Sequence, residues 1–144
     1  MADADTALER ESLRDLDGVR VAVENVANPL STDQLRKAVE AKLQSAGIKV
    51  LNSGEYPTGD PFLRVRVSAT AESGGMIGYL VQLDFAQIVF LRRNPAVTFN
   101  RAQTWAATQR LGLVRSARLA EKIRQELSDR VDQFINAYFA VNPK

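Results

Sequence analysis

Between residues 62 and 91, apolar and polar side chains alternate along much of the chain, and a short break occurs at Ser73-Gly-Gly75. Alternation of this kind places apolar side chains on one face of a strand, and a short glycine-rich break is typical of a hairpin turn. The pattern predicts two antiparallel strands, 62–70 and 76–91. A strand of some 15 residues would span about 50 Å, so we expect a bulge or bend near Ala86-Gln87, where the alternation slips.

The rest of the chain supplies three more strands and two main helices. Strands are expected at 19–26, 48–51 and 97–109, with 48–51 parallel to the first. A helix over 31–46 is indicated by Ser31 at its N-cap and Gly47 at its end. A second helix over 116–140 is indicated by an apolar stripe at helical spacing, formed by Leu119, Ile123, Leu127, Val131, Ile135 and Tyr138.

These elements predict an α+β fold with one mixed, mainly antiparallel sheet. With the short strand 48–51 not counted, the order of elements is α-β-α-β-β-β-α. Both main helices are expected on one face of that sheet. Residues 1–17 are expected to form an N-terminal helical extension, in which Thr6 and Glu9 make a capping box. With no repeat or linker, the chain is predicted to be a single domain over residues 1–144.

Two residue types are missing from the sequence. There is no Cys, which excludes thiolate catalysis and zinc–thiolate sites, and no His, the commonest general base and metal ligand. No phosphate-binding loop, dinucleotide fingerprint or calcium loop is present. Asp129 and Asp132 lie three apart, and a solvated helix face is the simpler interpretation of this pair. We expect no catalytic residues, no cofactor and no metal, and hence no enzyme.

Charge is distributed unevenly. Residues 1–60 carry 7 Lys or Arg against 11 Asp or Glu, whereas residues 61–144 carry 12 against 6. Ten of those 12 cations are Arg. Such a bias suits an anionic partner, although cations on solvated strand edges and helix faces would give the same count.

The sheet face turned away from the helices is the first candidate surface. Alternation assigns to it Phe62, Arg64, Arg66, Gln82, Asp84, Gln103 and Trp105. The first interpretation is a solvated face, with Arg64 or Arg66 neutralised by Asp84 across the strands. The second is a contact surface for another protein or a second copy, as in a homodimer. Nucleic-acid binding ranks third, because the paired aromatic residues of an RNA-recognition sheet are missing.

A second candidate site is an anion site at the start of the last helix. Helix N-termini favour anions, and the flanking cations Arg110, Arg115 and Arg118 would add to that preference.

The order of elements resembles a group of bacterial envelope domains. These include the N-terminal domain of the Tol-system protein TolB and domains of curli-secretion and penicillin-binding-protein-activating lipoproteins. The resembling stretches are Val19-Val26, Thr32-Leu51, Phe62-Phe90 and Leu119-Phe139. The segment Phe134-Pro143 also resembles the ends of exported bacterial proteins that have no assigned function. The resemblance implies an extracytoplasmic, non-enzymatic domain that acts through protein contacts.

The sequence thus favours a binding or scaffold module of the bacterial envelope, with a protein partner or self-association. The alternative is a cytoplasmic domain that binds nucleic acid or another anion through its Arg-rich C-terminal portion. The chain itself opens without a signal peptide, so a periplasmic location requires a signal segment upstream of Met1. No apolar run reaches the roughly 18 residues of a membrane span.

Overall fold

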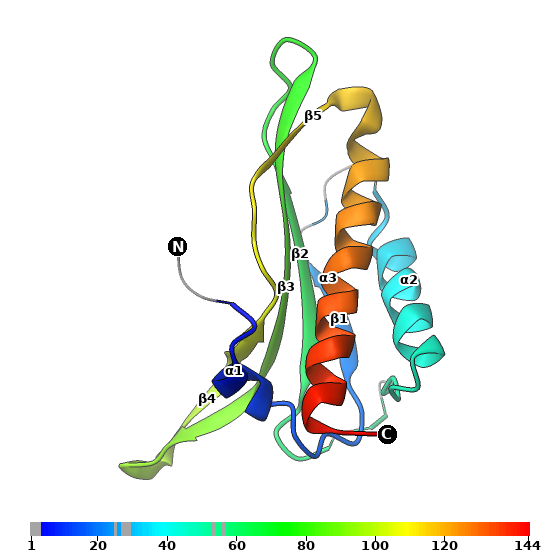
Figure 1. Cartoon of the computed structure of the whole chain (residues 1–144). Helices are drawn as coiled ribbons and strands as arrows, with labels where there is room; N and C mark the ends of the chain where they lie inside the picture. The colour runs from blue at the N-terminus through cyan, green and yellow to red at the C-terminus, as the bar shows by residue number, and fades with distance from the viewer. Residues whose placement is uncertain (1–3, 25, 27–29, 53, 56) are drawn as a thin grey trace.

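The computed structural model describes residues 4–24, 26, 30–52, 54, 55 and 57–144. Within these residues, five strands form one sheet, and helices cover one of its faces (Figure 1). The strands are β1 (Arg20–Glu24), β2 (Phe62–Ala69), β3 (Met76–Leu91), β4 (Asn94–Ala106) and β5 (Gly112–Arg115). The helices are α1 (Ala7–Glu11), α2 (Thr32–Ser45) and α3 (Leu119–Val141), with a 3-10 turn (Ser116–Arg118) before α3. The predicted α+β class is confirmed.

The sheet is mixed and mainly antiparallel. β1 pairs in parallel with β2, and β2, β3 and β4 form the predicted antiparallel meander. The predicted strand 48–51 is reduced to one parallel bridge between Val19 and Val50. Its pairing ends after two backbone hydrogen bonds to Val19, because the segment is only four residues long. The main parallel partner of β1 is therefore β2 and not 48–51.

Both main helices form where the sequence predicts them. The Ser31 hydroxyl accepts the amide N–H of Gln34 at 3.3 Å and caps α2. Gly47 adopts a φ of +90°, the left-handed conformation that ends a helix without strain only in glycine. α3 buries its predicted stripe against the sheet and α2, except that Ile135 and Tyr138 are only partly buried.

The core lies between these helices and one face of β2 and β3. The odd-numbered residues of both strands point toward the helices, and they are Leu63, Val65, Val67, Tyr79, Val81, Leu83 and Phe85. Phe85 stacks on Phe134 of α3 with ring centroids 6.0 Å apart. The even-numbered residues form the opposite face, as alternation requires.

β3 is longer than the helices that cover it. Its 16 residues would extend about 53 Å if straight, whereas the 23 residues of α3 extend about 35 Å. Pairing with β4 shifts register between Phe85 and Ala86, and again between Gln87 and Val89, which confirms the predicted irregularity near Ala86-Gln87. Beyond these shifts, β3 and β4 leave the body as a two-stranded projection (Figure 1).

The remaining elements are the N-terminal helix α1 and the short strand β5. Thr6 and Glu9 form the predicted capping box, but α1 ends at Glu11. β5 was not predicted from the sequence, and it pairs with the first residues of β3. None of the helices in the described part of the chain combines the length and apolar character that a membrane crossing requires.

Candidate functional site

The predicted surface on the open sheet face contains an internal charge network. Asp84 is buried, and its two carboxylate oxygens accept hydrogen bonds from Arg64 at 2.9 Å and Arg66 at 2.7 Å. The predicted cross-strand neutralisation is confirmed, and one acid serves both cations. Removing one partner of a buried ion pair typically costs about 3–5 kcal/mol, because the other charge is left buried and unpaired. The sheet therefore requires Arg64, Arg66 and Asp84 together.

The other residues of this face are arranged around that network. The pairings of Phe62 with Ala86, and of Ala86 with Gln103, place Phe62 and Gln103 on the same face. Phe62 is buried beneath the guanidinium of Arg101, which lies 4.9 Å from its ring centroid. The structure therefore places six of the seven predicted residues on this face, but the side chains of Phe62 and Asp84 are buried.

Trp105 is the exception, and its predicted exposure on this face is wrong. The register moves from Phe85 opposite Trp105 to Ala86 opposite Gln103, so Thr104 is an extra residue in β4. An extra residue reverses the alternation and turns Trp105 toward the helices. The indole is fully buried and contacts Phe134 edge to face, with centroids 5.4 Å apart.

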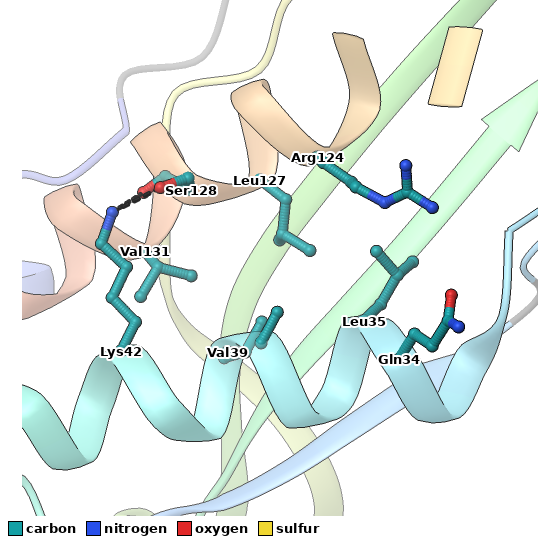
Figure 2. A pocket seen from close by; sticks show the side chains of 9 residues that line it. Gln34, Leu35, Val39, Lys42, Arg124, Leu127, Ser128 and Val131 are labelled. Carbon is teal, nitrogen blue, oxygen red and sulfur yellow. Dashed lines mark hydrogen bonds between the residues drawn. The ribbon is translucent and has the colours of Figure 1, made fainter. Parts of the chain in front are cut away.

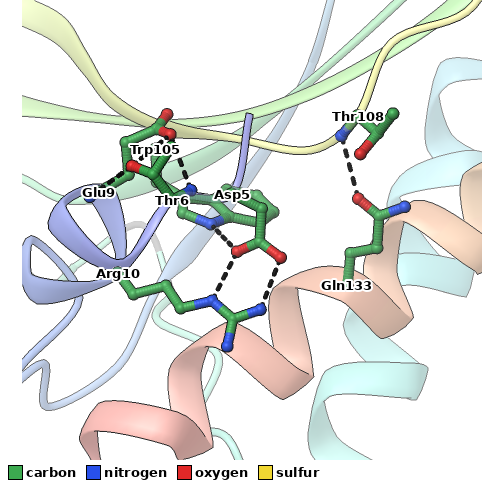
Figure 3. A network of polar contacts seen from close by, with 7 residues as sticks. All are labelled: Asp5, Thr6, Glu9, Arg10, Trp105, Thr108 and Gln133. Atoms are coloured by element: carbon green, nitrogen blue, oxygen red, sulfur yellow. Dashed lines mark hydrogen bonds and ion pairs between the residues drawn. The ribbon is translucent and has the colours of Figure 1, made fainter. Parts of the chain in front are cut away.

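The indole also fixes the N-terminal segment to the sheet. Its N–H donates to Asp5 at 2.8 Å, and Arg10 donates to both oxygens of the same carboxylate (Figure 3). Burial raises the pKa of Asp5, but the hydrogen bonds from Arg10 and Trp105 outweigh it and hold that pKa below its ordinary value. The Asp5 amide also donates to the Ala106 carbonyl at 3.0 Å. This polar cluster is structural.

The three arginines of the predicted anion site do not share one pocket. Arg115 ends β5, and Arg118 pairs with Glu121 at 3.6 Å beside the start of α3. Arg110 precedes β5, and the five residue steps from Arg110 to Arg115 correspond to about 17 Å of extended chain. Arg110 lines a different hollow from Arg118. The prediction that all three flank the helix start is wrong for Arg110, because the intervening strand was missed.

A small apolar pocket lies between α2 and α3. Leu35 and Val39 face Leu127 and Val131 across it, and Lys42 closes one end by donating to the Ser128 carbonyl at 3.0 Å (Figure 2). Its volume of about 130 Å³ is below the 300–1,000 Å³ of typical ligand pockets. We interpret it as the seam between two packed helices. Among the described residues, no three acidic side chains are close enough to hold a metal ion.

The feature that the sequence did not reveal is the projection itself, which we call the arm (residues 88–100 of β3 and β4). Large apolar side chains on it are exposed, with Phe90 at 61% and Phe99 at 49%. Ile88 and Val97 are exposed beside them, and Arg92 and Arg93 form the turn at the tip. The arm contains no acidic residue. Figure 1 shows it pointing away from both main helices.

Comparison with known proteins gives only distant similarity, and it is a similarity in structure. No protein-family model matches the chain, and no curated protein matches it in sequence. A crystal structure of a minor lipoprotein from Acinetobacter baumannii is similar over 88% of this chain and 97% of the lipoprotein chain. The TM-score is 0.37 and the sequence identity 15%. The similarity is too distant to assign a family.

Proposed function

We propose that this chain is a non-enzymatic binding module of the bacterial envelope, and that it holds a protein partner through the arm. The observation that carries this proposal is the exposure of Phe90 and Phe99 on a hairpin that lies outside the core. Contiguous exposed apolar surface on a soluble domain marks contact sites, and aromatic side chains are enriched among the residues that dominate binding energy.

The chemistry of the arm favours one class of protein partner. Cross-strand pairing puts Val89 and Phe99 on one side of the hairpin and Phe90 with Thr98 on the other. Apolar groups are therefore presented on both sides, with Arg92 and Arg93 at the tip. We expect a partner with an apolar cleft that is bordered by acidic side chains. A second copy fits less well, because it would bring two cationic tips toward each other.

The envelope location rests on the sequence pattern of the first strand, the first main helix and the meander. Fractionation of cells that express the native gene tests it separately. We expect the protein in the periplasmic or membrane-associated fraction. Recovery in the cytoplasm alone would contradict the location and leave the arm proposal standing.

Site-specific photocrosslinking tests the arm. A photoreactive amino acid at Val97 is expected to yield one discrete adduct with another protein, which mass spectrometry identifies. The double variant Phe90→Ser/Phe99→Ser should abolish the adduct, because each hot-spot residue contributes about 2 kcal/mol or more to the free energy of binding.

The matched control removes an equally exposed apolar side chain from another place. Leu8 lies on α1 and is 84% exposed, so Leu8→Ser should leave the adduct unchanged. Equal loss of the adduct in Leu8→Ser and in Phe90→Ser/Phe99→Ser would refute an arm-specific contact. An adduct of twice the chain's own mass would show a second copy on the arm and would contradict the proposed partner.

A further inference from the structure

A hollow of about 770 Å³ opens beside the outer edge of β3. The pairing of β4 with β3 ends where the Ala107 amide donates to the Leu83 carbonyl at 2.9 Å. The pairing of β5 with β3 begins where Gly112 lies opposite Tyr79. Between these two contacts, residues 108–111 bow away from β3 (Figure 1). The hollow therefore lies between two closed stretches of sheet, and the bowed segment forms one of its sides.

The opposite side of the hollow is formed by α3, which also holds the bowed segment. Arg130 and Gln133 of α3 line it, and the Gln133 side chain accepts the Thr108 amide N–H at 3.0 Å. This hydrogen bond fixes the start of the segment to the helix, so the hollow is preformed. Its volume is within the range of about 300–1,000 Å³ that ligand pockets have, in contrast to the seam between α2 and α3.

Apolar side chains provide much of the surface of the hollow. Leu80 of β3 and Leu111 of the bowed segment line it, and Leu111 is 80% exposed. Leu113 follows two residues later and is 71% exposed. Neighbouring exposed apolar side chains of this kind mark contact sites. An alkyl chain in the hollow would cover apolar surface that the protein itself leaves exposed.

Arg130 has hydrogen-bond donors that the protein does not use. It is only 6% exposed, and its Nε has no hydrogen-bond partner within the described part of the chain. Its ion pair with Glu126 is long at 3.7 Å, and the Glu126 Oε2 atom of that pair also lacks a hydrogen bond. A guanidinium has five N–H donors, and buried donors without acceptors are costly. A carboxylate in the hollow would accept hydrogen bonds from this guanidinium and lower that cost.

The charges around the hollow favour an anion with a single charge. Among the described residues that line it, Arg110 and Arg130 are cations and none is acidic. Glu126 lies behind them, and its other oxygen accepts the Tyr79 hydroxyl at 2.8 Å. Burial, followed by this contact with Glu126, raises the pKa of Tyr79 to about 12, so the phenol is neutral near pH 7. Two cations and one carboxylate leave a net charge of about one positive unit, which a monoanion neutralises.

We propose that this hollow, here called the 108–111 site, binds a small amphiphile that carries one carboxylate and an alkyl chain. Arg110 and Arg130 hold the carboxylate, and the chain lies against Leu80 and Leu111. Charge-assisted hydrogen bonds from arginine supply the preference for a carboxylate, and burial of the alkyl chain supplies the remaining affinity. The site is separate from the arm and does not depend on the function proposed for it.

Titration with octanoate, followed by NMR, tests the 108–111 site. We expect saturable shifts of the Arg130 Nε–H signal and of the Leu111 amide. Octan-1-ol has the same chain without the charge, and acetate has the same charge without the chain. Each should bind about tenfold more weakly than octanoate or worse, because each lacks one of the two contacts. The absence of saturable shifts at millimolar octanoate would overturn the proposal.

Two substitutions of exposed residues, which keep the fold, test the two contacts separately. Arg110→Met should weaken octanoate binding about tenfold or more, and Leu111→Ser about threefold or more. Arg124→Met removes an exposed cation from another part of α3 and should bind octanoate as the wild type does. Leu8→Ser removes an equally exposed leucine from α1 and should also have no effect.

The outcomes that contradict the 108–111 site differ for its two parts. Octan-1-ol binding as tight as octanoate, or equal losses in Arg110→Met and Arg124→Met, would overturn the recognition of the carboxylate. Acetate binding as tight as octanoate, or equal effects of Leu111→Ser and Leu8→Ser, would overturn the contact with the chain. The arm variant Phe90→Ser/Phe99→Ser should retain octanoate binding, and its loss there would place the ligand on the arm and overturn the site.

Discussion

Replacing Trp105 measures how firmly the N-terminal segment, β4 and α3 are held together. The indole is fully buried, contacts Phe134 and donates to Asp5. Truncation of a buried aromatic side chain costs about 3–5 kcal/mol, and we place Trp105→Ala at the upper end because the hydrogen bond to a carboxylate is lost as well. Trp105→Phe retains most of the ring packing and should lose about 2–3 kcal/mol.

Urea unfolding followed by far-ultraviolet circular dichroism gives both values. Trp105 is the only Trp in the chain, so wild-type fluorescence provides an independent test. Native emission should be blue-shifted and protected from iodide quenching, and unfolding should remove that protection. Replacing a surface residue would change the free energy of unfolding by less than about 0.5 kcal/mol. A Trp105→Ala loss that small, or an indole quenched in the native state, would refute the placement of Trp105 in the core.

Two further predictions concern the buried end of β3. A Cβ on Gly112 would overlap the ring and hydroxyl of Tyr79, so Gly112→Ala should cost about 1–3 kcal/mol. Gly54→Ala meets only an ordinary contact at 3.4 Å, and equal unfolding midpoints for the two variants would argue against the close approach of Gly112 to Tyr79. Because the pKa of Tyr79 is raised to about 12, its stabilising effect is complete below pH 10 or so and is lost as pH rises toward 12. The tyrosinate absorbance that Tyr79→Phe removes should therefore titrate near pH 12 while circular dichroism stays native, and titration of that component near pH 10 would contradict the buried contact with Glu126.

Alternation predicted the body of the sheet because its cause is local. In β2 and the first part of β3, every second side chain meets the helices, and the sequence records this directly in the run from Leu63 to Val67. The two helices were predicted for the same reason, since their caps and apolar stripes are local features.

The errors have non-local causes. Trp105 was predicted on the wrong face because β4 contains one extra residue, Thr104. Such a bulge depends on how two strands pair and not on the sequence of either strand alone. β5 was not predicted because its four residues are too few to show an alternation of apolar and polar side chains. Without β5, Arg110 was predicted too close to the start of α3.

The arm was missed because its apolar residues have the composition of a core strand. Phe90 and Phe99 lie on opposite sides of the hairpin, and both lie beyond the part of the sheet that α3 covers. Their exposure follows from the difference in length between a strand and the helix that covers it, and this difference is visible only once the two elements are aligned in space.

We propose that β3 buries its middle part and offers its last part as a contact surface, and two phenylalanines on that strand test this proposal directly. Phe85 is fully buried, whereas Phe90 is 61% exposed. The free energy of unfolding, measured in urea, should fall by about 3–5 kcal/mol in Phe85→Ala and change by less than about 0.5 kcal/mol in Phe90→Ala. Similar losses in both variants would show that the arm belongs to the core and would contradict its role as a free contact surface.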